Sequence, residues 1–134
     1  MKTSHRVFVY ETFEDFGKLE EICSSIPFYF SDIYDIEKSF GKHSKYATIS
    51  KQIIFLIIQR SKSLATDILR NLDILEENKI VKTADLQILV QDLLGIIKNI
   101  ESDYRNGNYN GILKKIKILA EKCSDINQKF KRKV

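Results

Sequence analysis

The chain contains few residues that break helices or cross-link a fold. Its 134 residues include one proline, five glycines, two cysteines and no tryptophan. So little proline and glycine predicts long uninterrupted elements, and the many lysines, glutamates, isoleucines and leucines favour helices. A chain of this length can bury enough surface to form a core without disulfides or metals. We therefore expect one globular domain over residues 1–134.

The chain also lacks a long apolar run and a cysteine framework. Its longest apolar run, residues 53–58, has six residues, whereas a membrane helix needs about 20. Val7–Tyr10 is too short an apolar stretch for a signal-peptide core. Cys23 and Cys123 form no CxxC pair and fall on apolar positions, where small buried hydrophobes are expected. We therefore expect a cytoplasmic protein with no membrane segment.

Residues that would carry chemistry are sparse. The two histidines, His5 and His43, have no histidine or cysteine partner at metal-ligand spacing. No phosphate-binding loop is complete, and the match of Ser39-x-x-Lys42 to a Ser–Lys nucleophile pattern is expected by chance in a chain rich in lysine and serine. We therefore expect a protein that is not an enzyme and has no catalytic residue, metal site, cofactor or small-molecule ligand.

The clearest pattern is a pair of helices near the C-terminus. Apolar residues recur every three or four positions over residues 86–100 and again over residues 112–130. Between them, Arg105–Gly111 carries both Asn-Gly dipeptides, which are typical of turns. Thr83 is placed to cap the first of the two helices. The pattern predicts a long antiparallel helical hairpin.

The first half of the chain predicts two or three more helices. Val7–Tyr10 is expected to be extended, within an N-terminal arm of residues 1–11, and Thr12 to cap a first helix. Pro27 is expected to break that helix and to start an aromatic-rich second one, which ends at Gly41. A long helix should then cover residues 46–77, with residues 53–58 at the bundle centre because every face there is apolar. The predicted fold class is all-α, a four- or five-helix antiparallel bundle.

Heptad positions predict how the hairpin pairs. Its g positions would place three polar pairs face to face, namely Asp85–Lys129, Asp92–Lys122 and Asn99–Lys115. Its e positions are mostly apolar: Val90, Ile97, Tyr104, Leu113 and Ala120. A second apolar face must be buried against the long helix or against a partner.

Charge alternates in blocks along the chain. Residues 11–37 and 73–103 are acidic, whereas residues 38–70 and 112–134 are basic. One interpretation is that neighbouring helices of opposite charge attract each other within the molecule. The other is that the two basic blocks form a surface for nucleic acid.

The second interpretation identifies candidate nucleic-acid-binding residues. They are Lys51, Arg60, Lys62 and Arg70 in the first basic block, and Lys114, Lys117, Lys131, Arg132 and Lys133 in the second, which ends in a basic tail of residues 129–134. The turn of the hairpin offers a candidate recognition loop with Arg105, Asn108 and Tyr109.

The leading functional hypothesis is a helical interaction or accessory protein. It would dock a protein partner, or a second copy of itself, through an apolar helix face. The alternative is an accessory subunit that binds RNA or DNA through basic blocks 38–70 and 112–133.

Overall fold

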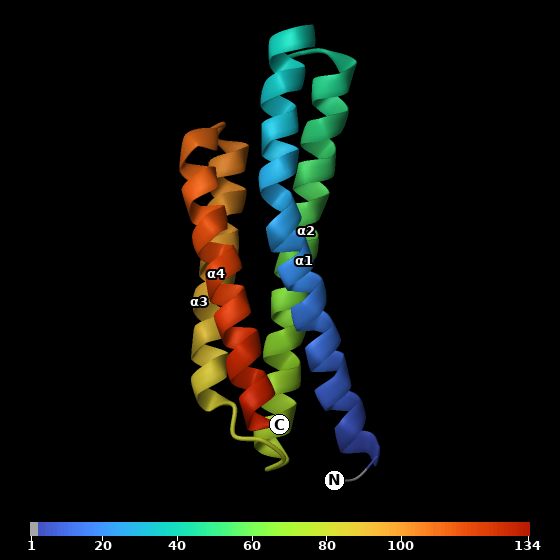
Figure 1. Ribbon diagram of the computed structural model, residues 1–134, viewed down its shortest axis with the longest axis vertical. Coiled ribbons are helices and arrows are strands. Elements are labelled where there is room, and N and C mark those ends of the chain that lie inside the picture. The colour runs from blue at the N-terminus through green and yellow to red at the C-terminus, as the bar shows by residue number, and fades with distance from the viewer. Residues whose placement is uncertain (1–2) are drawn as a thin grey trace.

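The computed structural model is all-α (Figure 1). It describes the backbone of residues 3–134 and every side chain in that range except those of Thr3, Ser4, Tyr109 and Asn110. The four helices are α1 (Thr3–Phe40), α2 (Lys45–Glu77), α3 (Ala84–Arg105) and α4 (Tyr109–Lys133). No strand occurs in the described residues. The all-α prediction is therefore confirmed, and the helix count is four.

The predictions for the N-terminal third were wrong, because α1 is a single helix. Residues 3–11 of the expected arm lie inside α1, and residues 1–2 lie outside the described residues. Thr12 does not cap a helix but is buried and donates its hydroxyl to the Phe8 carbonyl at 2.7 Å. Pro27 lies within the helix, where its missing N–H leaves one carbonyl a turn earlier without a donor. Ile26 and Phe30 on either side of Pro27 are buried. Burial on both sides of the proline compensates for one lost hydrogen bond, so the helix continues.

The middle of the chain agrees closely with expectation. Gly41 follows α1 with φ +93°, a conformation that favours glycine. Ser44 then caps α2 by accepting a hydrogen bond from the Ala47 N–H at 3.1 Å. Thr83 stands at the cap position of α3, but its hydroxyl donates instead to the Leu72 carbonyl at 2.6 Å. Thr83 thereby ties the start of α3 to α2.

One apolar core runs between the helices, each of which contacts two neighbours. α1 packs against α2 and α4, and α3 packs against α2 and α4. At one end of the core, the rings of Phe13 and Phe16 in α1 contact Phe130 in α4, with centroids 4.8 and 5.7 Å apart. Residues 129–133 therefore belong to α4 and do not form the predicted tail, because the fully buried Phe130 anchors them.

The predicted pairing of α3 with α4 needs a correction of one helical turn. Lys133 pairs with Asp85 at 3.1 Å and Lys115 pairs with Asp103, so the start of α3 lies against the end of α4. In both observed pairs, one partner lies four residues further along its helix than predicted: Asp85 pairs with Lys133 instead of Lys129, and Lys115 pairs with Asp103 instead of Asn99. Lysine side chains lean toward the N-terminus of their own helix, so each reaches a carboxylate about one turn from the level of its own Cα. The predicted Asp92–Lys122 pair is not among the ion pairs of the described residues.

The α1–α2 pair extends beyond the α3–α4 pair at one end of the molecule (Figure 1). That projecting end contains the turn at residues 41–44, whereas the α3–α4 turn lies lower. Helix surface at the projecting end therefore has no cover from α3 or α4. Within residues 3–134, none of the helices combines the length and the apolar character that a membrane span requires.

Candidate interaction surface

The basic residues of α2 are largely paired within the molecule. Lys51 contacts Glu37 at 2.8 Å, Lys62 contacts Glu101 at 3.1 Å, and Arg70 contacts Asp67 at 3.2 Å. Three of the four basic candidates on this helix thus face a carboxylate. Three of the seven basic residues of the first block, 38–70, are therefore ion-paired within the molecule.

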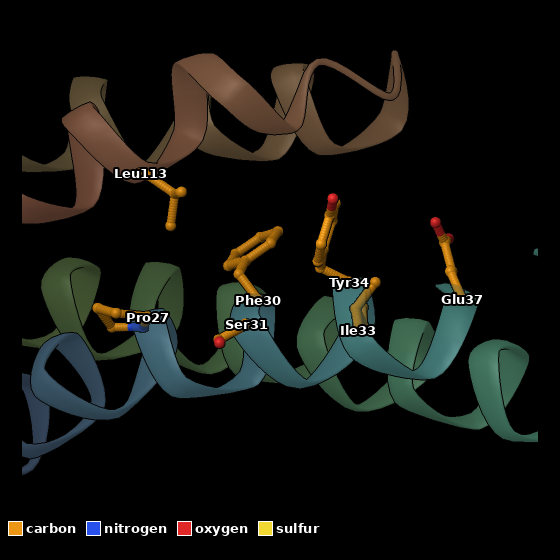
Figure 2. Close-up of a pocket in the computed structure, with 7 residues that line it drawn as sticks. All are labelled: Pro27, Phe30, Ser31, Ile33, Tyr34, Glu37 and Leu113. Atoms are coloured by element: carbon orange, nitrogen blue, oxygen red, sulfur yellow. The ribbon is translucent and has the colours of Figure 1, made fainter. Parts of the chain in front are cut away.

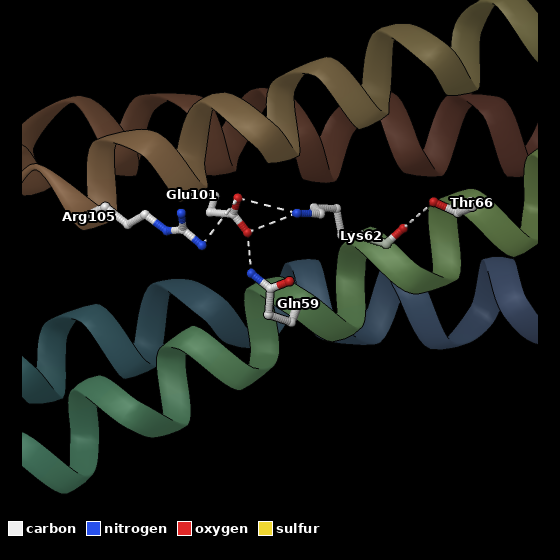
Figure 3. A network of polar contacts seen from close by, with 5 residues as sticks. All are labelled: Gln59, Lys62, Thr66, Glu101 and Arg105. Carbon is white, nitrogen blue, oxygen red and sulfur yellow. Dashed lines mark hydrogen bonds and ion pairs between the residues drawn. The ribbon is translucent and has the colours of Figure 1, made fainter.

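Figure 3 shows the most extensive of these pairings, centred on Glu101 of α3. Lys62 donates to both carboxylate oxygens at 3.1 and 3.3 Å, Gln59 donates to one of them, and Arg105 approaches at 3.9 Å. Burial opposes ionisation of Glu101, but the hydrogen bonds from Lys62 and Gln59 outweigh it and lower its pKa below the ordinary 4.5. The network therefore joins α2 to α3 through a stably ionised carboxylate.

The basic residues of α4 are the more exposed set. Among the described residues, no ion pair within 4.0 Å forms at Lys114, Lys117, Lys131 or Arg132, whereas Lys133 pairs with Asp85. The helices packed against α4 are α1 and α3, so α2 lies diagonally across the bundle from it. The two basic blocks consequently do not form one continuous surface.

The candidate recognition loop folds back on the molecule. Arg105 pairs with Glu101, and its guanidinium carbon lies 5.7 Å from the Phe55 ring centroid, in cation–π range. The Asn108 N–H donates to the Asp103 carbonyl at 2.9 Å. The Tyr109 side chain lies outside the described residues. Arg105 thus takes part in packing α3 against α2.

The most prominent exposed feature is an apolar strip along the outer side of α1 and α2, which we name the α1–α2 seam. Its members are Tyr29, Ile36 and Phe40 on α1, and Tyr46, Ile49 and Ile53 on α2. The α1 members recur at seven and four residues and those of α2 at three and four, so each set shares one helix face. All but the half-buried Ile36 are between 38% and 61% exposed.

Two contacts make the seam continuous across the two helices. At the projecting end, the rings of Phe40 and Tyr46 contact each other at a tilt of 45°, with centroids 4.9 Å apart. Further along, one hollow of about 350 Å³ is lined by residues of α1 and α2: Tyr29, Asp32, Asp35, Ile36, Ser50 and Ile53. The exposed carboxylates of Asp32 and Asp35 thus border the apolar strip on α1.

A second hollow lies on the other side of α1, between α1 and α4 (Figure 2). Its volume is also about 350 Å³, and its lining residues are Pro27, Phe30, Ser31, Ile33, Tyr34, Glu37 and Leu113. In Figure 2, Leu113 points down from α4 toward Phe30 and Tyr34, which point up from α1. Leu113 belongs to the apolar second face of the hairpin, and it is 51% exposed.

The rest of that second face is covered within the molecule. Val90 and Ile97 are buried in the core. Tyr104 meets Phe30 edge to face, at 6.3 Å between centroids, and donates its hydroxyl to the Lys51 carbonyl. The hairpin therefore keeps most of its second face covered, and the seam is a separate exposed apolar surface.

The prediction that residues 53–58 lie at the bundle centre was wrong for part of that segment. Ile53 is 41% exposed and Leu56 is 65% exposed, whereas Ile54 and Ile58 are buried. The physical reason is that the seam side chains face away from α3 and α4. At this level Lys51 still contacts Tyr104 of α3, and Ile54, next to Ile53 in the chain, is buried on the inner face of α2. One feature of the sequence indicated an exposed apolar surface: residues 53–58 are apolar on every helix face. A helix in a bundle of this size buries only some of its faces.

Among the described residues, no group of three or more histidine, cysteine, aspartate or glutamate side chains is placed to hold a metal ion. The thiols of Cys23 and Cys123 are fully buried, as predicted. No family model, curated protein or solved structure was found to match the chain. The surface of this molecule is therefore the basis for inferring its function.

Proposed function

We propose that this chain is a non-enzymatic interaction protein that docks a protein partner through the α1–α2 seam. An antiparallel four-helix bundle would serve as the scaffold that holds the seam in place. The observation that carries the proposal is the continuity of five exposed large apolar side chains across two helices. Isolated exposed hydrophobic residues are common, whereas continuous patches of this kind mark interaction sites.

The size of the seam supports this proposal. With about 200 Å² for a large apolar side chain, the exposed fractions add up to roughly 500 Å². That is near the upper end of about 300–600 Å² for the largest patch on a monomer. Aromatic residues, which supply three of the five exposed members, are also enriched in protein interfaces.

The support beneath the seam favours a preformed docking surface. α1 and α2 are the two longest helices, with 38 and 33 residues. Directly beneath the strip, Ile33 and Ile54 are buried at 2% and 1% exposure. A rigid apolar surface loses little conformational freedom when a partner binds. We propose that this docking takes place in the cytoplasm, since two free buried thiols are typical of a reducing compartment.

Site-specific photocrosslinking in the native host tests the proposal. A benzophenone amino acid replaces Ile53 in the seam, or Ile88 on α3, which is 61% exposed and serves as the matched control. We expect one discrete protein adduct from position 53, none from position 88, and loss of the adduct when Phe40→Ser is added. No adduct from position 53, or equal adducts from both positions, would contradict the proposal.

The second candidate function is binding of RNA or DNA, and it is now confined to α4. The exposed Lys114, Lys117, Lys131 and Arg132 support it, whereas Glu121 and Asp125 on the same helix reduce the local positive charge. Contacts to phosphates release counterions, so such binding must weaken steeply as salt rises. A titration of RNA and DNA at increasing ionic strength tests it, and binding that is absent at low salt or independent of salt would reject it.

A further inference from the structure

We infer that the α1–α2 seam binds a second copy of this chain, with the two α1–α2 pairs side by side in opposite directions around a two-fold axis near Ile49. This inference deepens the proposed function and depends on it. It rests on the area of the seam and on the position of charges along it.

The area matches what a stable dimer needs. The seam exposes roughly 500 Å² of apolar surface. Homodimer interfaces are about 65% apolar, so this patch corresponds to roughly 800 Å² per partner. That value is the standard size for a specific interface.

The charges along the seam have opposite signs at its two ends. At the tip, Lys42 is exposed in the turn and Lys45 lies one helical turn before Ile49 on the same face of α2. Toward the middle of the molecule, the exposed Asp32 and Asp35 border the hollow that contains Ile53. Phe40, Tyr46, Ile49 and Ile53 lie between or beside these charged groups, whereas Tyr29 lies beyond Asp32 on α1.

Contacts between α1 and α2 give the levels of these groups along the seam. The Phe40–Tyr46 ring contact and the Lys51–Glu37 ion pair place Ile49 at the level of residues 37–39 of α1. With a rise of 1.5 Å per residue, Lys45 lies about 6 Å from Ile49 toward the tip. On the other side, Asp35 lies about 4–5 Å and Asp32 about 9 Å from the level of Ile49.

Such a pattern is complementary to itself under a two-fold rotation. A two-fold contact pairs the same patch of both subunits, so the tip of one copy meets the middle of the other. Lys42 and Lys45 of each copy then face Asp32 and Asp35 of the other copy, while Ile49 packs near its own equivalent. A parallel arrangement would instead place like charges opposite each other, which is disfavoured.

Sedimentation velocity of the purified chain tests the inference over a roughly hundredfold range of concentration. We expect a concentration-dependent species of twice the 15.6 kDa chain mass. The double variant Asp32→Lys/Asp35→Lys should raise the dimer dissociation constant at least about tenfold. Adding Lys42→Asp/Lys45→Asp to the same chain should restore dimerisation, because the swapped charges again face each other.

Control measurements separate dimerisation from folding and from the proposed function. All four charged positions are exposed, so circular dichroism should show equally folded variants. A monomer at every concentration, a dimer unaffected by Asp32→Lys/Asp35→Lys, or loss without rescue would each overturn the inference. If the chain is monomeric and position 53 still crosslinks to a different protein, the inference fails and the proposed function stands.

Discussion

At the scale of single residues, Glu101 is the polar centre between α2 and α3 (Figure 3). Its pKa is lowered, so its contribution to stability is present above pH 4.5 and is lost as the pH falls through the lowered value. We expect Glu101→Gln to cost about 1 kcal/mol of unfolding free energy at pH 7. The cost should shrink below pH 4.5.

Urea unfolding at pH 7 and at pH 3 measures this difference. Glu121→Gln, which removes an exposed carboxylate from α4, is the matched control and should change stability by less than about 0.5 kcal/mol. A cost for Glu101→Gln that is equal at both pH values would show that the charge of Glu101 does not stabilise the network.

The pKa of Asp15 on α1 is shifted in the opposite direction from that of Glu101. Burial, followed by the nearby charge of Asp67, raises the pKa of Asp15 above the ordinary 3.8. A raised carboxyl pKa means that ionisation destabilises the folded state above that pKa, and that this penalty disappears below pH 3.8. Asp15→Asn should therefore raise the unfolding free energy at pH 7, by less than about 1 kcal/mol, and leave it unchanged at pH 3. Thermal unfolding at the two pH values checks this, and a variant less stable than the parent at pH 7 would contradict it.

The two cysteines should report on unfolding. A hydrogen bond with Cys23 and burial raise the pKa of the Cys123 thiol, and both side chains are fully buried. Because the thiolate is the reactive form, we expect neither thiol to react with a maleimide in the folded protein. Mass spectrometry should show labelling only at urea concentrations that unfold the chain. Rapid labelling in native buffer would show that the α1–α4 contact opens readily.

At the scale of helices, local patterns predicted α2, α3 and α4 to within a few residues. The regular apolar spacing over residues 86–100 and 112–130 was sufficient, because it matches the helical period and ends at turn residues. Local rules failed for α1, where Pro27 and Thr12 are favourable helix boundaries in isolation. Burial of Val9, Ile26 and Phe30 along one face outweighs those preferences, and only the tertiary structure reveals it.

Gly95 and Gly107 have different backbone conformations, so replacing each with alanine gives a matched pair of variants. Gly95 is exposed within α3, and an added Cβ would meet nothing within 4 Å. Gly107 follows α3 with φ +73°, which strains other residues. Gly95→Ala should stabilise the protein by about 0.5–1 kcal/mol, whereas Gly107→Ala should destabilise it by about 1 kcal/mol or more. Chemical denaturation measures both, and equal shifts in the same direction would be inconsistent with these backbone assignments.

At the scale of the whole molecule, part of the alternating charge is paired between neighbouring helices. Lys51, Lys62 and Lys133 each contact a carboxylate on a neighbouring helix. The sequence was compatible with both internal pairing and a nucleic-acid surface, because residue types alone do not say which helices are neighbours. The diagonal placement of α2 and α4 separates the two basic blocks and favours internal pairing for the first.

The seam could not be located from sequence for a related reason. An apolar stripe at helical spacing is the same in a core as at a docking surface, so Ile49 and Ile53 looked like interior residues. The exposure of Ile53 follows from the direction in which its side chain faces, because the adjacent Ile54 is buried and the nearby Lys51 contacts Tyr104 of α3. Which face of each helix the other helices cover therefore decides whether such a stripe forms a core or a surface.

Chemical crosslinking at Ile49 tests the central claim most directly, because this residue lies next to the proposed two-fold axis. Ile49→Cys adds one accessible thiol to a chain whose own thiols are buried. A short bismaleimide should convert this variant to a covalent dimer in dilute solution, whereas Ile88→Cys on α3 should stay monomeric. No covalent dimer from Ile49→Cys, or the same yield from both positions, would contradict the account of the α1–α2 seam as a surface for a second copy.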